Sequence, residues 1–163
     1  MPDRAALAFV KWRKERPDLD SLPMAVLGRL AETALTVMRD RLEPLFAKFG
    51  LQAGEFDVLA TLRRSGEPCA LTPTALYEAA MISSGGMTSR IDRLENAGLV
   101  ERRAHPTDRR GALVALTPKG RALIDEAVGR HVDNERAILA CLSSGEQAEL
   151  DRLLAKLLAG LNA

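Results

Sequence analysis

Residues 83–103, SSGGMTSRIDRLENAGLVERR, carry side chains that can bond nucleic acid within one expected helix. The helix is predicted over 84–97, with Met87, Ile91 and Leu94 as its apolar stripe. The opposite face then presents hydroxyl and guanidinium groups, which can bond base edges and phosphate oxygens. These spacings predict major-groove contacts from a set of small and basic residues. The set is Ser84, Gly85, Thr88, Ser89 and Arg93.

The glycines at the start of this helix have a cost, because glycine destabilises a helix by about 0.8–1 kcal/mol relative to alanine. Small residues there let the backbone approach DNA closely. The free N–H groups and the positive end of the helix also suit a phosphate. The alternative interpretation is a frayed helix start with a serine cap.

A polar hairpin follows the helix. Strand-like runs at 99–103 and 112–116 flank the turn HPTDRRG at 105–111. Arg109 and Arg110 at its tip are predicted to enter a DNA minor groove, where the potential is most negative. Asp108 is close enough in sequence to pair with Arg110 and orient its guanidinium.

Charge along the chain is uneven although the formal net charge is only +1. Residues 90–121 hold eight Lys and Arg against four acidic residues, whereas 122–163 hold four against seven. A local basic excess on a nearly neutral chain favours one polyanion-binding patch. An ordinary solvated surface is the alternative that charge alone leaves open.

The remaining segments are predicted to be mainly helical, with Leu and Ala dominant and aromatics at 4%. Gly50 is expected to end a long helix, and Thr72-Pro73 and Thr117-Pro118 to start two others. The fold class is therefore mainly α with a small β wing, a winged helix-turn-helix. The further expected helices are 5–15, 23–49, 53–64, 73–80, 118–141 and 144–161.

Composition excludes several classes of protein. No apolar run reaches the ~18–20 residues of a membrane span, and the N-terminus does not look like a signal peptide, so a cytoplasmic protein without membrane contact is expected. Cys69 and Cys141 form neither a disulfide framework nor a zinc cluster. Both are expected to be reduced and inert, with thiol sensing as the alternative.

The segments RIDRLENAGLVERR and DRRGALVALTPKG, at 90–103 and 108–120, resemble the MarR family of bacterial winged-helix regulators. The resemblance covers nearly the whole chain. It implies an obligate homodimer, acting as a repressor, that binds a pseudo-palindrome in double-stranded DNA. It also implies a single domain over 1–163. The DNA-binding lobe would lie at about 53–118, and the dimerisation helices at 5–49 and 119–161.

Within this family the chain is similar to the urate-responsive PecS branch, through 12–20, 23–24, 55–64 and 88–90. The resemblance implies a urate pocket formed by Trp12, Asp57 and Arg90, with Arg64 coupling the pocket to the DNA-binding lobe. The chemistry is reasonable for a flat purine anion. An arginine fork can bond it at two points, and an indole can stack on it.

Other functions are less well supported by the residues. The chain has no nucleophile elbow, phosphate loop or metal-spaced histidine pair, so it is not expected to be an enzyme or to hold a cofactor. His131, Asp133 and Glu135 do not share one helical face, which disfavours a metal site. A phenolic effector or a winged helix used only for protein contacts remains as an alternative. The segment 84–87 is smaller than in many family members, which leaves the operator sequence open.

Overall fold

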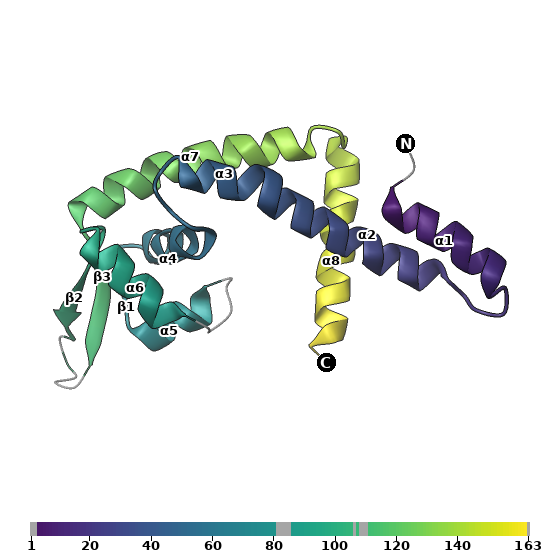
Figure 1. The fold of residues 1–163 in the computed structure, drawn as a ribbon. Coiled ribbons are helices and arrows are strands. Elements are labelled where there is room, and N and C mark those ends of the chain that lie inside the picture. Colours follow the sequence, from purple (N-terminus) through teal and green to yellow (C-terminus); the bar gives the residue numbers. More distant parts are fainter. Residues whose placement is uncertain (1–2, 81–85, 106, 108–110, 163) are drawn as a thin grey trace. The chain divides into compact units, whose positions relative to one another are not determined.

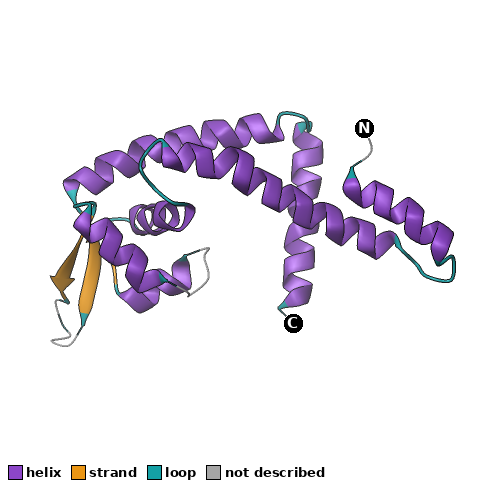
Figure 2. Ribbon diagram, in the orientation of Figure 1, coloured by secondary structure: helices purple, strands orange, loops and turns teal. Residues whose placement is uncertain are grey.

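The computed structural model describes residues 3–80, 86–105, 107 and 111–162. It contains two compact units, Met1–Pro44 and Leu45–Ala163, and each is described by itself below. Figure 2 shows that helices make up most of the chain and that the strands gather in one small sheet. The predicted class, mainly α with a β wing, is confirmed.

The first unit consists of α1 (Arg4–Glu15), α2 (Leu22–Val37) and the π-helical turn η1 (Met38–Leu42). Asp3 caps α1 by accepting a hydrogen bond from the Ala6 backbone N–H at 2.7 Å. The same carboxylate accepts from Arg29 on α2, which ties the start of α1 to its neighbour. Small residues bring the two helices together, since Ala5 and Ala25 are both buried (Figure 1).

The helix expected over 23–49 is wrong in detail, because the structure divides this stretch into α2, η1 and α3 (Glu43–Ala47). Pro44 explains the interruption. A proline inside a helix has no N–H to donate to the carbonyl four residues before it, here that of Asp40 within η1. The predicted stop is confirmed. Gly50 adopts φ 70°, and the next N–H, of Leu51, reaches back to the Phe46 carbonyl at 3.1 Å.

The second unit starts within α3 and contains the helix-turn-helix and the sheet (Figure 1). Its helices pack around the faces of α4 that carry Val58, Leu59 and Leu62, all fully buried. Its further elements are α4 (Ala53–Arg64), β1 (Ala70–Leu71), α5 (Pro73–Ala79), α6 (Met87–Asn96), β2 (Val100–Ala104), β3 (Ala112–Leu116), α7 (Pro118–Leu139) and α8 (Ser144–Leu161).

The sheet is antiparallel with the strand order β1-β3-β2. The predicted hairpin is confirmed, with its register running from Val100 opposite Leu116 to Ala104 opposite Ala112. The strand β1 was not expected. It pairs with β3 over only two residues, which is too short for the alternation of polar and apolar residues that indicates a strand.

Hydroxyl caps start three helices of this unit. Thr72 and Thr117 each accept a hydrogen bond from the backbone N–H three residues later, as predicted for Thr-Pro starts. Ser143 and Glu146 form a reciprocal capping box at the start of α8. Local sequence therefore sets where these helices begin.

Gly120, in the first turn of α7, is a position where packing excludes a side chain. A Cβ there would collide with the backbone carbonyl of Leu99. We expect Gly120→Ala to destabilise the fold by about 1–3 kcal/mol, the usual cost of overpacking. Urea unfolding followed by circular dichroism measures this change.

Gly129→Ala is the matched control in the same helix, because a Cβ at Gly129 meets no atom within 4 Å. It should instead stabilise the fold by up to about 1 kcal/mol through helix propensity. An equal increase in the free energy of unfolding for Gly120→Ala and Gly129→Ala would contradict the packing argument.

Candidate nucleic-acid interface

The second helix of the helix-turn-helix, α6, is anchored by the predicted apolar stripe. Met87, Ile91 and Leu94 are all buried, which confirms the stripe. The helix begins later than expected, because Gly86 precedes it with φ 85°. Glycine adopts this left-handed conformation without steric cost, so Gly86 serves the turn and lies outside the helix. Ser84 and Gly85 lie outside the described residues.

The other face of α6 is exposed. Thr88 and Ser89, both predicted to contact DNA, lie in the first turn with exposed side chains. Arg93, one turn later, is directed to neighbouring protein groups. Its Nη1 donates to the Ser89 hydroxyl at 3.0 Å, so two of the expected contact residues are bonded to each other.

Arg93 also joins α6 to the start of α4. Its Nε donates to the Glu55 carboxylate at 2.6 Å, and its Nη2 donates to the Gln52 side-chain carbonyl at 3.3 Å. Glu55 is a buried acid that also caps α4 by accepting from the Gln52 backbone N–H at 2.8 Å. Sequence reasoning did not identify Glu55 or Gln52. The Gln-x-x-Glu spacing of a capping box was the available signal, but it carries no information about a partner on α6.

Arg90, predicted to bind a ligand, lies against the same turn of α4. The space that a Cβ of Gly54 would need is occupied by the Nε, Cδ and Cζ atoms of Arg90. Gly54 therefore admits the Arg90 side chain to the surface of α4. Residues three apart share a helical face, so this is also the face of Asp57.

Asp57 and Arg64 lie one above the other on α4. The Nη1 atom of Arg64 is 3.9 Å from an Asp57 carboxylate oxygen, a long ion pair. The other terminal nitrogen, Nη2, donates to the Ala79 carbonyl at 2.6 Å. Arg64 thus links Asp57 to the C-terminal end of α5.

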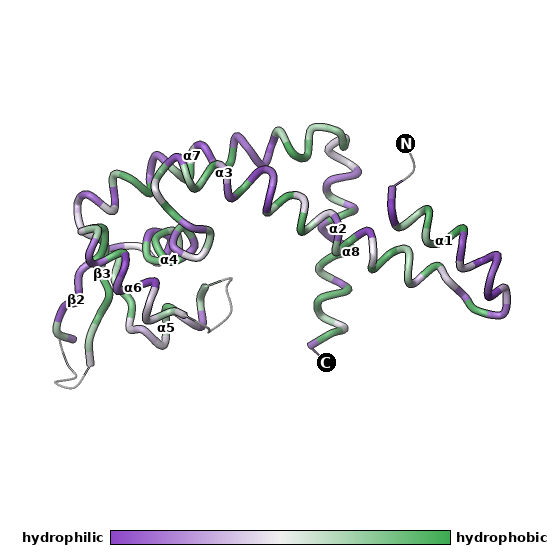
Figure 3. The backbone as a smooth tube through the Cα atoms, in the orientation of Figure 1, coloured by the Kyte–Doolittle hydropathy of each residue, from purple (hydrophilic) through white to green (hydrophobic). Residues whose placement is uncertain are grey.

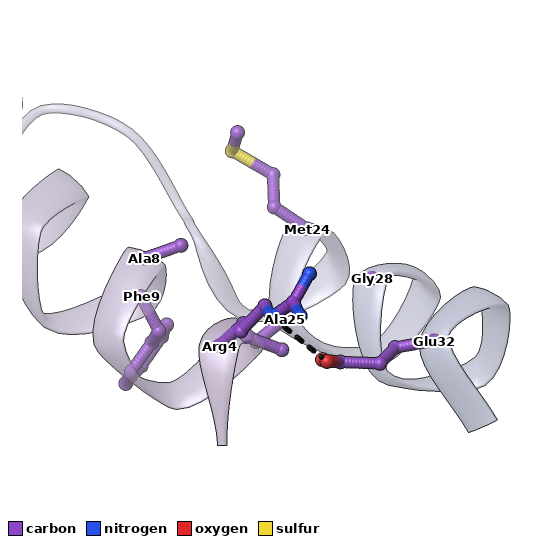
Figure 4. Close-up of a pocket in the computed structure, with 8 residues that line it drawn as sticks. Arg4, Ala8, Phe9, Met24, Ala25, Gly28 and Glu32 are labelled. Carbon is purple, nitrogen blue, oxygen red and sulfur yellow. Dashed lines mark ion pairs between the residues drawn. The ribbon is translucent and has the colours of Figure 1, made fainter. Parts of the chain in front are cut away.

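Trp12, the fourth residue of the expected ligand set, belongs to α1 in the first unit. Its side chain is exposed. A cavity of about 260 Å³ lies between α1 and α2, and none of the four residues lines it. Figure 4 shows Phe9 and Met24 at this cavity and an ion pair between Arg4 and Glu32 beside it. The cavity is largely apolar, and its one arginine, Arg4, is paired with Glu32; Arg90 and Asp57, the residues expected to bind a purine anion, do not line it.

Several basic residues of the predicted patch are engaged by contacts within the chain. Arg102 on β2 pairs with Asp92 and Glu95 of α6, and the hydrogen bond to Asp92 raises the pKa of Arg102 above its ordinary value. Arg103 pairs with Glu101 at 2.5 Å. Lys119 donates to the Ala97 carbonyl at the end of α6, and Arg121 pairs with Glu67. A count of charges along the sequence does not show which of these cations already face an acid of the same chain.

The wing itself is described up to its tip. The His105 backbone N–H donates to the Gly111 carbonyl at 3.1 Å and closes the hairpin. The predicted minor-groove residues Arg109 and Arg110, and the orienting residue Asp108, lie outside the described residues.

The neighbours of the described histidines and cysteines show whether these residues form a metal site or a disulfide. No group of His, Cys, Asp and Glu there could hold a metal ion. His131 packs 4.8 Å from the Phe56 ring and pairs with Glu135 at 3.1 Å, so it belongs to the core beside α4. Cys69 is buried and Cys141 exposed, and neither forms a disulfide.

Within the described ranges, none of the helices combines the length and apolar composition that a bilayer crossing requires.

Comparison with known proteins places these features in a family. The model of the MarR family matches residues 49–111, a range that contains α4, the helix-turn-helix and β2. The regulator PecS of Dickeya dadantii strain 3937 is 47% identical over 146 residues, which cover 90% of this chain and 87% of PecS.

Solved structures agree with this assignment. A variant of Escherichia coli MarR in complex with operator DNA has a TM-score of 0.70 at 30% identity, covering 90% of this chain and 97% of that chain. Bordetella bronchiseptica BpsR, studied for the regulation of its DNA binding by 6-hydroxynicotinic acid, has a TM-score of 0.70 at 29% identity and covers 80% and 91%. The relatives are transcriptional regulators, which confirms the prediction that the chain is not an enzyme. Since the 47% identity with PecS holds over nine-tenths of the present chain, this chain belongs to the MarR family and is a transcriptional regulator that binds DNA.

Proposed function

We propose that the chain is a homodimeric repressor that binds a pseudo-palindromic operator and releases it when a small aromatic anion such as urate binds. The observation that carries this proposal is the position of Arg90. This residue belongs to the DNA-facing helix α6, yet its guanidinium lies against Gly54 on α4. A ligand that bonds Arg90 therefore acts directly on the helix that meets DNA.

The chemistry of the ligand follows from the residues near Arg90. A guanidinium fork bonds planar anions at two points, and Asp57 on the same face of α4 can accept from a ring N–H. Trp12 would stack on the ring plane. Similarity to PecS at 47% identity supports this set, and BpsR, regulated by an aromatic acid, supports a ligand of this class. A phenolic acid is the alternative effector at the same residues.

Arg64 offers the second route from ligand to DNA. Its guanidinium lies between Asp57 and the Ala79 carbonyl at the end of α5. An anionic ligand bound near Asp57 would attract the Arg64 guanidinium. The hydrogen bond from Arg64 to the Ala79 carbonyl of α5 would then weaken. A ligand shifts a conformational equilibrium only through such differences in affinity between the two states.

The DNA contacts we propose follow the geometry of winged helices. Thr88 and Ser89, together with Ser84 and Gly85, would meet the major groove, because they surround the start of α6. Arg109 and Arg110 would enter the flanking minor groove, with Asp108 orienting Arg110.

Dimerisation is proposed from the surface of α8, which has no buried residue. Figure 3 shows hydrophobic turns repeated along this helix. The leucines recur at spacings of three and four, so they form one stripe that water covers in a single chain. A second copy is the natural occupant, because a symmetric dimer presents two recognition helices to the two halves of a pseudo-palindrome. The stripe consists of Leu150, Leu153, Leu154, Leu157, Leu158 and Leu161.

Fluorescence anisotropy on labelled DNA from immediately upstream of the protein's own gene tests the regulator and its effector together. We expect tight binding that is lost as urate rises, and a Trp12→Ala variant that binds DNA as the parent does but responds weakly to urate. Salicylate serves as the phenolic comparison. Release of the DNA by salicylate but not by urate would identify the effector as a phenolic compound. Release by neither compound would overturn the proposed pocket.

Gly54→Ala tests the role of Arg90 without truncating Arg90 itself. The added methyl group would displace a flexible side chain, so stability should be unchanged or rise by up to about 1 kcal/mol through helix propensity. We expect the urate concentration for half-release to rise at least tenfold. Gly129→Ala, which has the same helical effect in open space, should respond as the parent does. An unaltered response in Gly54→Ala would argue against Arg90 as a ligand residue.

The combined variant Leu154→Glu and Leu157→Glu tests the dimer. Two carboxylates in the leucine stripe should convert a dimer into monomers in sedimentation equilibrium and abolish tight operator binding. Lys156→Glu introduces the same side chain on α8 outside the stripe and should leave the dimer intact. A parent protein that sediments as a monomer would refute the proposed interface.

A further inference from the structure

The contact between Glu55 and Arg93 has features that surface ion pairs lack. The Glu55 side chain is only 8% exposed, and both of its oxygens are bonded. Oε2 accepts from the Gln52 backbone N–H at 2.8 Å, and Oε1 accepts from Arg93 Nε at 2.6 Å. One carboxylate therefore caps α4 and holds a side chain of the recognition helix.

Arg93 is oriented by all three of its nitrogens. Besides the bond from Nε to Glu55, Nη1 donates to the Ser89 hydroxyl at 3.0 Å and Nη2 to the Gln52 amide oxygen at 3.3 Å. The guanidinium is planar and rigid, so three partners in different directions fix its plane. Three of its five N–H donors are thereby engaged by protein groups, and the short bond from Nε to Glu55 holds the side chain against the start of α4.

Moving Arg93 to a DNA phosphate would leave the Glu55 carboxylate buried without its counter-charge. Arg93 is 46% exposed but Glu55 only 8%, so losing Arg93 is unfavourable because the carboxylate left behind lacks most of its hydration as well as its partner. The phosphate would also have to replace a charge-assisted bond that is already short. The geometry thus opposes the simple expectation that Arg93 contacts DNA.

We propose that Arg93 is a positioning residue that clamps α6 to the start of α4 through Glu55 and acts on DNA only through Ser89. The clamp comprises Gln52, Glu55, Ser89 and Arg93. A serine hydroxyl has one donor hydrogen and two acceptor sites, and Arg93 occupies an acceptor site. The Ser89 O–H is thereby left to donate to an acceptor on DNA, such as a phosphate oxygen, guanine O6 or thymine O4.

The clamp is distinct from the Arg90 contact, although the two arginines share a face of α6. Arg90 lies against Gly54, a residue without a side chain, whereas Arg93 is bonded to a buried carboxylate at the next residue of α4. The proposed role of the clamp rests on DNA binding, which membership of the family establishes. It does not depend on the proposed effector. A failure of the urate experiment therefore leaves it unaffected.

The test compares the salt dependence of operator binding for the parent and Arg93→Met. Removing one protein–phosphate interaction flattens the slope of log K against log salt concentration by about 0.9. A clamp predicts weaker binding, by about tenfold, with an unchanged slope. A slope flattened by the amount expected for one phosphate would overturn the proposal and return Arg93 to the DNA backbone.

Three further substitutions, each combined with Arg93→Met, separate positioning from a general loss of folding. Glu55→Gln combined with Arg93→Met removes both charges, so it should regain much of the thermal stability that Arg93→Met alone loses while binding DNA no better. Ser89→Ala should weaken the parent but add nothing to Arg93→Met, since Arg93 acts through that hydroxyl. Thr88→Ala, the preceding exposed hydroxyl on α6, should remain additive with Arg93→Met. Additive loss for Ser89→Ala, or no recovery in the charge-free pair, would contradict the clamp.

Discussion

In the proposed mechanism, DNA recognition depends on the attachment of α6 to the first turn of α4. The buried stripe of Met87, Ile91 and Leu94 fixes the face that α6 turns to the core. The polar part of the attachment consists of two arginines directed at the adjacent residues Gly54 and Glu55. Hydrophobic burial is non-directional, so the stripe alone would allow small shifts of the helix along α4. The directional bonds of a planar guanidinium restrict such shifts.

The sequence predicted the elements of this arrangement better than their partners. Helix starts at Thr72, Thr117 and Ser143 and the hairpin register could be found locally, because caps and turns depend on residues a few positions apart. The role of Glu55 could not, since its partner is 38 positions away and is brought near only by folding. The start of α6 was misplaced for a related reason. Whether Gly86 continues a helix or turns into it depends on its φ, and glycine permits either.

The distribution of charge could likewise be read from the sequence, whereas the pairing of the charged residues could not. The basic excess over 90–121 is real in the sequence, but pairing with acids on α6, β2 and neighbouring loops accounts for Arg102, Arg103 and Arg121. Such pairs contribute little to stability when exposed. They do determine which cations remain to attract phosphates. With the arginines of β2 engaged in this way, the proposal for minor-groove binding rests on the arginines that the sequence places at the wing tip.

Position 54 has a consequence for how regulators of this kind diverge. Most residues that shape a binding site also support the fold, so changing specificity risks losing the protein. In the proposed site the absence of a side chain at Gly54 makes the room, and the atoms that occupy it belong to the flexible Arg90 side chain rather than to backbone. Glycine and alanine codons differ by a single nucleotide. Under the proposed role of Arg90, one mutational step at position 54 would therefore change the response to the effector without an unstable intermediate, while leaving the residues that face DNA unchanged.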